Sequence, residues 1–362
     1  MENNPRFQLT SKQLIFVIIG TTIAMQLVSL ARITSVEAKQ DAWLAVILGS
    51  AAPLISLLLI ERLGRRFPSL TLAEISRELF GRFFGSFFTL GFILYCLLAY
   101  SVSLRNFSEI SSLYILPKTP FWVITLFGII AAVYIASMGA KTLARINELL
   151  FYILLIVILL IIPTLKVADY TNLLPVGGGG ISGLIKGALQ TTFAYAGLEI
   201  LLVAYPMVTR KDEVLKAGIT ANVISLLIYL IIVVVSLMVF GSEFLSKITW
   251  PGITLLKVID VPVFERLEFF FLIPWVALGV RPTMNILFAA SFSLIQLLNI
   301  DINRYYPYAV VGLGLVLYIA SLLPKNALEV ARWANLAGYS FLIIAIGYPL
   351  IFHTATFIRK KR

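Results

Sequence analysis

The 362 residues are 60% hydrophobic and 13% charged, and their mean hydropathy is +0.96. A soluble globular domain carries about 25% charged residues, so the composition excludes that class and indicates a protein whose solvent is lipid. The formal charge of +11 does not indicate nucleic acid as a partner, because the lysines and arginines stand in short connectors between apolar segments. Cys96 is the only cysteine, which excludes a disulfide within the chain.

Apolar runs of about 20 residues, the length that crosses the hydrocarbon core of a bilayer, recur along the whole chain. They leave no room for a separate soluble domain. The sequence therefore predicts an all-α, polytopic membrane protein, with residues 1–362 forming a single transmembrane domain of ten helices. The first run is expected to be a retained helix, because no small-residue cleavage site follows it. The ten helices are expected at approximately 12–31, 42–61, 84–106, 119–138, 146–166, 184–206, 216–240, 266–294, 305–323 and 333–357.

The basic residues between these helices predict the orientation of the chain in the membrane. With the N-terminus in the cytoplasm, 17 lysines and arginines fall on the cytoplasmic side and 11 on the other side, while Arg281 falls within a span. Cytoplasmic connectors of membrane proteins are enriched in these residues. Both termini are therefore expected in the cytoplasm.

Two connectors have the pattern of short helices at the membrane surface. Thr71 and Glu74 form a capping box and Gly81 supplies a helix stop, which predicts an amphipathic helix on the cytoplasmic side. Residues 250–257 predict a second surface helix on the outer side, because a tryptophan suits the headgroup level and a lysine suits water. The glycine run at 177–180 has no phosphate-loop pattern after it and is expected to be a flexible outer loop.

Ten spans divide into five plus five, and because five is odd the second half enters the membrane from the opposite side. This is the geometry of inverted-repeat transporters. Repeat one is expected at about 12–166 and repeat two at about 184–323, with the last helix at 333–357 belonging to repeat two. In such folds the first helix of each half is broken near the midplane, where freed backbone groups hold the substrate. The stretches 20–26 and 193–199, which contain glycine and polar residues, are the expected breaks.

Glu199 and Arg281 are ionisable residues within predicted spans, a costly placement that tends to mark an ion or substrate path. A guanidinium suits a carboxylate, either of a substrate or of Glu199; an arginine that extends toward the cytoplasmic interface is an equally weighted reading of Arg281. Glu199 is also compatible with a structural carboxylate bonded to the backbone. No residues have the spacing of a zinc site, a haem site or a nucleophile with its base, so no metal, cofactor or enzymatic activity is expected.

Several segments, taken in order along essentially the whole chain, resemble the spore germination permease family. These segments are 9–13 (LTSKQ), 41–43 (DAW), 67–74 (FPSLTLAE), 79–81 (LFG), 197–200 (GLEI), 250–251 (WP), 265–268 (ERLE) and Trp275. Each motif alone is weak, but together they are fairly specific.

The resemblance implies a five-plus-five fold related to amino acid permeases, and the role of the B subunit of a nutrient germinant receptor in endospore-forming bacteria. It implies a place in the spore inner membrane beside an A subunit and a lipoprotein C subunit. The implied activity is binding of a small germinant, such as an amino acid, in a permease-like pocket to trigger germination. A proton- or sodium-coupled amino acid transporter is the alternative, and a scaffold for partner subunits is a third possibility.

The predicted ligand site combines the two breaks with nearby side chains. Backbone near 20–22 and 196–197 is expected to hold the amino and carboxylate ends of an amino acid. Tyrosines of spans three and six are expected to shape its side-chain end, with Glu199 and Arg281 linking helices or gating the cytoplasmic side. The candidate residues are Gly20, Thr21, Thr22, Ala24, Met25, Gln26, Tyr95, Ala99, Tyr195, Ala196, Gly197, Glu199 and Arg281.

The match to the family is uneven across these candidates. Tyr95, Ala196, Gly197 and Glu199 fit the family pattern. Residues 24–26 stand where relatives often carry a glycine-small-glycine stretch, and Arg281 stands where relatives have small polar residues. This departure leaves open whether the ligand is a plain neutral amino acid.

Overall fold

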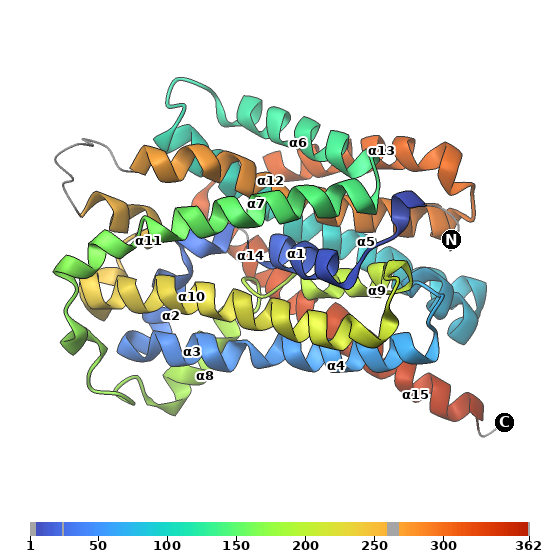
Figure 1. The fold of residues 1–362 in the computed structure, drawn as a ribbon, viewed down its shortest axis with the longest axis horizontal. Coiled ribbons are helices and arrows are strands. Elements are labelled where there is room, and N and C mark those ends of the chain that lie inside the picture. The colour runs from blue at the N-terminus through green and yellow to red at the C-terminus, as the bar shows by residue number, and fades with distance from the viewer. Residues whose placement is uncertain (1–4, 24, 259–267, 361–362) are drawn as a thin grey trace.

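The computed structural model describes residues 5–23, 25–258 and 268–360. In these residues it is built of helices that lie roughly along one common axis and form an elongated bundle (Figure 1). The predicted all-α class is confirmed.

Seven helices in the described part of the chain are long and apolar enough to cross a membrane. They are Leu30–Arg66, Leu72–Tyr114, Ala140–Val167, Lys211–Leu245, Leu272–Leu298, Ile302–Leu322 and Ala327–Ile358. The apolar helix Phe121–Ser137 is shorter, at 17 residues, and the first and sixth predicted spans are each interrupted. The arrangement is consistent with ten spans.

The helical elements are as follows. The first half contains η1 Pro5–Phe7, α1 Ser11–Thr22, η2 Met25–Val28, α2 Leu30–Ala38, η3 Lys39–Asp41, α3 Ala42–Gly49, α4 Ala51–Arg66, α5 Leu72–Tyr114, α6 Phe121–Ser137, α7 Ala140–Leu159, η4 Ile162–Val167 and η5 Tyr170–Leu173. The second half contains α8 Gly180–Gln190, η6 Leu198–Ile200, α9 Leu201–Ala204, η7 Tyr205–Met207, η8 Lys211–Glu213, α10 Val214–Leu245, α11 Pro251–Thr254, η9 Leu255–Lys257, α12 Glu268–Leu298, α13 Ile302–Leu322, α14 Ala327–Leu342, η10 Ile343–Gly347 and α15 Tyr348–Lys360.

The first span of each half is interrupted midway, as the sequence predicts. α1 ends at Thr22, and Ile23 takes an extended conformation with φ −79° and ψ 92° before η2 and α2 continue. α8 ends at Gln190, and the chain then runs through turns at 191–197 before η6. The expected broken helices one and six are therefore confirmed.

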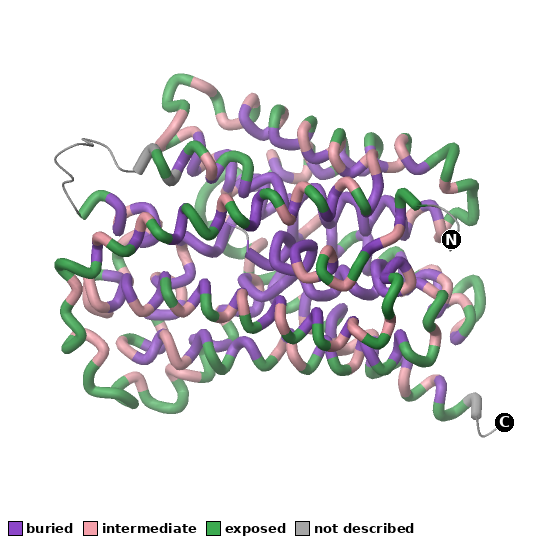
Figure 2. The backbone as a smooth tube through the Cα atoms, viewed as in Figure 1, coloured by how far each residue is buried: buried purple, intermediate pink, exposed green. Residues whose placement is uncertain are grey.

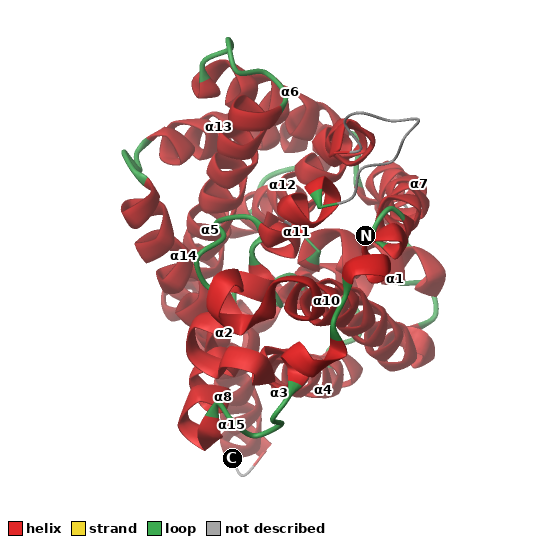
Figure 3. Ribbon diagram, turned by 90° about the vertical axis from the view of Figure 1, so that its left-hand side faces the viewer, coloured by secondary structure: helices red, strands yellow, loops and turns green. Residues whose placement is uncertain are grey.

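The interrupted first span lies in the middle of the bundle. α1 packs against α7, α10 and α12, and α5 packs extensively on α12. The chain around α1 is mostly buried, whereas exposed segments lie at the ends and on the outer helices (Figure 2). Seen along the bundle, α6 and α13 lie at one edge and α8 and α15 at the opposite edge (Figure 3). Large apolar side chains on the outer helices are exposed, among them Phe127 at 68%, as expected for a surface that faces lipid.

Helices form at both predicted connectors, as the start of α5 and as α11 with η9, but the second is largely buried in the bundle, with Ile253, Leu255 and Leu256 at most 1% exposed. The Thr71 N–H donates to Oε2 of Glu74 over 2.9 Å, which completes the capping box at the start of α5. Gly81, with φ 78°, turns this helix directly into span three, so no loop separates the two. On the other connector, the Trp250 ring packs edge-on against Tyr114 just before α11.

The glycine run at 177–180 is tied down by Asp41, which contrasts with the flexible loop that the sequence suggests. The two carboxylate oxygens of Asp41 accept hydrogen bonds from the N–H groups of Gly177, over 2.8 Å, and Gly179, over 2.7 Å. The Asp41 side chain is buried, and these bonds satisfy its charge. They join the connector between spans one and two to the segment just before span six.

Candidate functional site: a pocket between two interrupted spans

A small pocket lies where the two interrupted spans meet α5. Its walls come from three segments of the chain: Thr21, Thr22, Met25 and Gln26 of span one, Phe193 and Ala196 of span six, and Tyr100 and Ser103 of α5. The pocket is narrow, with a cavity volume of about 10 Å³. Its open part has room for about one water molecule, so it is smaller than an amino acid.

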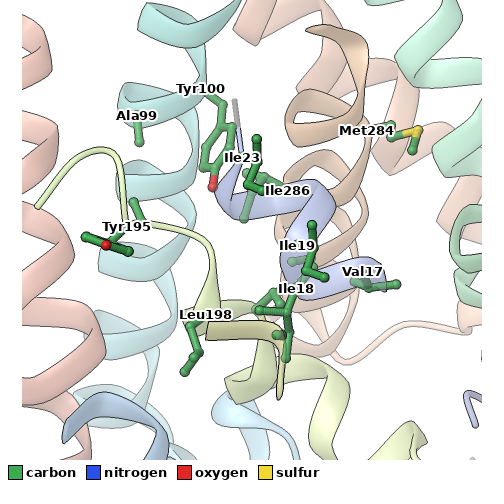
Figure 4. Packing of buried hydrophobic residues seen from close by; sticks show 14 of the residues in the cluster. Val17, Ile18, Ile19, Ile23, Ala99, Tyr100, Tyr195, Leu198, Met284 and Ile286 are labelled. Carbon is green, nitrogen blue, oxygen red and sulfur yellow. The ribbon is translucent and has the colours of Figure 1, made fainter. Parts of the chain in front are cut away.

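Two hydroxyl groups in the pocket wall are buried without hydrogen-bond partners. Tyr100 is 4% exposed and Ser103 is 3% exposed, and neither hydroxyl has a hydrogen-bond partner within the described residues. Figure 4 shows the Tyr100 hydroxyl directed toward the break at Ile23. A buried polar group without a partner costs about 1–3 kcal/mol. These hydroxyls are therefore free to bond a polar group that enters the pocket.

The two breaks are in direct contact at Gly197. Its φ of 141° lies in a region that L side chains rarely adopt. A Cβ built on Gly197 would lie 2.7 Å from the backbone nitrogen of Thr22 and 2.8 Å from the Thr22 Oγ1. Only glycine allows span six to approach span one this closely.

Tyr229 of α10 links the two breaks from the side. Its hydroxyl lies 2.9 Å from the carbonyl oxygen of Thr22 and 2.7 Å from that of Ala194. Its ring packs edge-on against Tyr195, whose hydroxyl donates to the carbonyl oxygen of Val46 over 3.0 Å. Tyr229 thus satisfies carbonyl groups that the interrupted helices leave without intrahelical partners.

Glu199 is fully buried beside the break of span six, and both of its carboxylate oxygens have donors. Oε2 accepts from the Gly197 N–H over 2.7 Å, and Oε1 accepts from the Tyr95 hydroxyl over 2.5 Å. Glu199 thus binds the backbone of the break in its own span. This agrees with the alternative in which Glu199 is a structural carboxylate bonded to the backbone. It is not paired with Arg281.

Arg281 is 1% exposed and lies at the end of α1. The reading in which it extends toward the cytoplasmic interface is therefore wrong. Its Nε donates to the carbonyl oxygen of Leu278 over 3.3 Å, and its Nη2 donates to that of Ile23 over 3.4 Å. Nη1 has no hydrogen-bond partner, and no ion pair within the described residues includes this guanidinium.

A pair of buried amide side chains contacts α1, the part of span one that precedes the break. The Asn147 side-chain NH₂ donates to Oδ1 of Asn285 over 2.7 Å, and the Asn285 NH₂ lies 2.9 Å from Oγ1 of Thr21. A Cβ built on Gly20 would overlap Oδ1 of Asn147. Gly20 is thus the position at which span five approaches span one, and it does not line the pocket.

The predicted residues divide into three groups. Five of them line the pocket: Thr21, Thr22, Met25, Gln26 and Ala196. Seven surround the pocket without lining it: Gly20, Tyr95, Ala99, Tyr195, Gly197, Glu199 and Arg281. Ala24 lies outside the described residues.

The sequence interpretation missed three residues of the pocket wall, Tyr100, Ser103 and Phe193. Tyr100 and Ser103 are three residues apart and therefore share one face of α5. Ser103 continues the i, i+4 row of the expected residues Tyr95 and Ala99, whereas Tyr100 lies on a neighbouring row of the same helix. Helical periodicity groups residues on a face, but it does not say which face of a wholly apolar span meets the cavity.

Comparison with known proteins places the chain in a family. The family model described as "Spore germination protein" matches residues 8–330. The chain is 27% identical to Spore germination protein YndE of Bacillus subtilis (strain 168), with 99% of each chain covered. It is 22% identical to Spore germination protein GerQB of Bacillus cereus, with 96% of each covered, and 23% identical to Spore germination protein B2 of Bacillus subtilis (strain 168), with 98% of this chain and 96% of the relative covered.

The fold also occurs among solved structures. The structure described as "Crystal structure of MhsT in complex with L-phenylalanine" is similar with a TM-score of 0.68 over 96% of this chain and 90% of that chain. At 13% sequence identity this similarity concerns the fold alone. The family match covers most of the chain and agrees with the resemblance that its motifs suggest. The chain belongs to the spore germination protein family.

Proposed function

We propose that this protein is the B subunit of a nutrient germinant receptor, which binds an amino acid in the pocket between the two breaks and thereby triggers spore germination. The observation that carries the proposal is the pair of buried, unpartnered hydroxyls of Tyr100 and Ser103 in the wall of that pocket. Buried hydroxyls without partners also occur elsewhere in the described residues, for example at Ser111, and this pair differs from them by its place in the wall of a pocket between the two interrupted spans. A small polar ligand satisfies this pair.

The contacts across the pocket suggest how binding produces a signal. Gly197 packs on Thr22, and Tyr229 bonds carbonyl groups of both breaks, so the two interrupted spans are joined in the structure. An amino acid needs more space than the pocket offers, so the breaks must separate to admit it. A ligand that binds the separated form better shifts the population toward that form. Because Tyr100 and Ser103 bind the ligand, α5 moves with it. This movement carries the signal to the surface of the bundle.

The proposal includes the setting of the protein. An A subunit and a lipoprotein C subunit are the proposed partners, in the spore inner membrane, with both termini in the cytoplasm. η1 and the end of α15 lie at the same end of the bundle, which supports placing both termini on one side (Figure 1). The division into repeats at 12–166 and 184–323, with the helix at 333–357 in repeat two, belongs to the same proposal.

The test separates a receptor from a transporter. Binding of the twenty standard L-amino acids to the purified protein is measured by thermal shift, and each ligand found is then tested for uptake into proteoliposomes. Saturable binding without accumulation is expected for a receptor. Accumulation driven by a proton or sodium gradient would instead support the coupled transporter, and binding of none of the twenty would contradict an amino acid germinant.

A further inference from the structure

Arg281 is a buried cation that has no counterion among the residues that the structure describes. Its side chain is 1% exposed, and the two hydrogen bonds that it donates, to the carbonyl oxygens of Leu278 and Ile23, are long at 3.3 and 3.4 Å. Nη1, which carries two N–H donors, has no partner within the described residues. A charge removed from water is costly unless an opposite charge and hydrogen bonds compensate it. The guanidinium therefore lacks the partner that its burial requires.

The protein does not supply that partner from the other buried charge near the breaks. Glu199 has both carboxylate oxygens engaged, one by the Gly197 N–H and the other by the Tyr95 hydroxyl. None of the ion pairs within the described residues involves Arg281. Within the described residues, therefore, no acidic side chain balances the charge of Arg281.

Arg281 lies beside the break of span one, next to the pocket but not among the residues that line it. Nη2 bonds Ile23, which follows the pocket residue Thr22 at the break. The same turn of α12 also approaches a pocket residue, since a Cβ built on Gly279 would lie 2.9 Å from Cε of Met25. The guanidinium and the pocket thus border the same interruption of span one.

We propose that Nη1 of Arg281 binds the carboxylate of the ligand, so that the site accepts small carboxylates and rejects analogues in which this group is neutral. The inference rests on the proposed binding of a small molecule between the breaks. A planar guanidinium matches a carboxylate in geometry and charge, and their bond is stronger in a site without water. The hydroxyls of Tyr100 and Ser103 then remain for the other polar groups of the ligand.

The experiment compares each amino acid that binds with its own α-carboxamide, which has nearly the same shape but no carboxylate. Dissociation constants are measured on the purified full chain. The amide is expected to bind the native protein at least about tenfold more weakly than the acid, because a hydrogen bond to a charged group is lost. In Arg281→Gln the acid is expected to weaken at least about tenfold while the amide changes little, so that the preference for the acid disappears.

Arg105→Gln is the matched control. Arg105 is also a buried arginine, but it lies 3.9 Å from Glu109 and over the ring of Phe121, away from the pocket wall. This variant should keep the preference for the acid. Arg281→Lys, which retains the charge without the planar fork, should bind the acid with intermediate affinity.

Each outcome bears on the inference. Equal binding of acid and amide by the native protein, or an undiminished preference in Arg281→Gln, would overturn it and leave the pocket between the breaks as the binding site. Binding of neither acids nor amides would overturn the proposed amino acid ligand and this inference together. If Arg281→Gln does not fold, the comparison of acid with amide on the native protein and on Arg281→Lys decides the matter.

Discussion

The hydroxyl of Tyr95 donates a hydrogen bond of 2.5 Å to Oε1 of Glu199 and so connects span three to the break of span six. The other carboxylate oxygen of Glu199 accepts from the N–H of Gly197 over 2.7 Å. One buried carboxylate therefore satisfies a backbone donor that the interrupted helix exposes and a side chain of the neighbouring span. Because a buried carboxylate without donors is costly, this pair of bonds ties the position of α5 to the conformation of the break.

Tyr95→Phe is expected to lower the free energy of unfolding by about 1.5–3 kcal/mol, because Glu199 loses the donor to one of its two oxygens. Reversible denaturant unfolding in lipid nanodiscs measures the change. Tyr134→Phe is the control, because Tyr134 is 64% exposed and its loss should leave stability unchanged. A Tyr95→Phe protein as stable as the native one would show that this hydrogen bond contributes nothing to the fold.

Gly197→Ala is expected to destabilise the protein by at least about 1–3 kcal/mol and to reduce ligand affinity, since the new Cβ meets Thr22 and the φ of 141° strains any side chain. Gly312→Ala is the matched control, because a Cβ built there has no neighbour within 4 Å. In the middle of α13 this change should be neutral or stabilise the helix by up to about 1 kcal/mol. Thermal unfolding and ligand binding of the two variants, measured side by side, check the prediction. Equal tolerance of both substitutions would contradict the direct contact of the two breaks.

Tyr100→Phe and Ser103→Ala are expected to weaken ligand binding without weakening the fold. Each change removes a buried hydroxyl that has no partner within the described residues, so the protein should be as stable as before or slightly more stable. The ligand loses one hydrogen bond in each variant, which corresponds to about 0.5–1.5 kcal/mol, or up to about tenfold in the dissociation constant.

Ser111→Ala is the control for these two variants. Ser111 is also on α5 and buried, its hydroxyl also has no partner in the described part of the chain, and it does not line the pocket. Its substitution should leave the dissociation constant unchanged. Similar affinities for all three variants and the native protein would place the ligand elsewhere.

Asn147 and Asn285 are expected to act as one unit. Replacing either by leucine leaves the other amide without its partner in a buried position, so each single change should be strongly destabilising. The double substitution should cost less than the sum of the two, with a coupling energy of about 0.5–3 kcal/mol. A double-mutant cycle of unfolding free energies measures this coupling, and additive effects would show that the two amides do not depend on each other.

The class of fold and the places where two helices break follow from the order of the amino acids alone. Lipid as solvent requires long apolar helices whose backbone groups are satisfied internally, so span length and hydropathy are visible residue by residue. The breaks at 20–26 and 193–199 are predictable as well, because glycine and polar residues stand out within apolar runs. The motifs along the chain, Gly197-Leu-Glu199 among them, together indicate the family.

Which side chains meet depends instead on the packing of the whole bundle. Glu199 and Arg281 are plausible partners in the sequence, yet Glu199 bonds Gly197 and Tyr95, while Arg281 lies at the end of α1 with free donors. Tyr100 rather than Tyr95 lines the pocket. In a soluble protein the polar face of a helix shows how the helix is rotated, but these spans are apolar on every side. Their rotation is set by close packing at positions such as Gly197, which meets the backbone of span one, and Gly20, which meets the Asn147 side chain. Such contacts exist only in the assembled bundle.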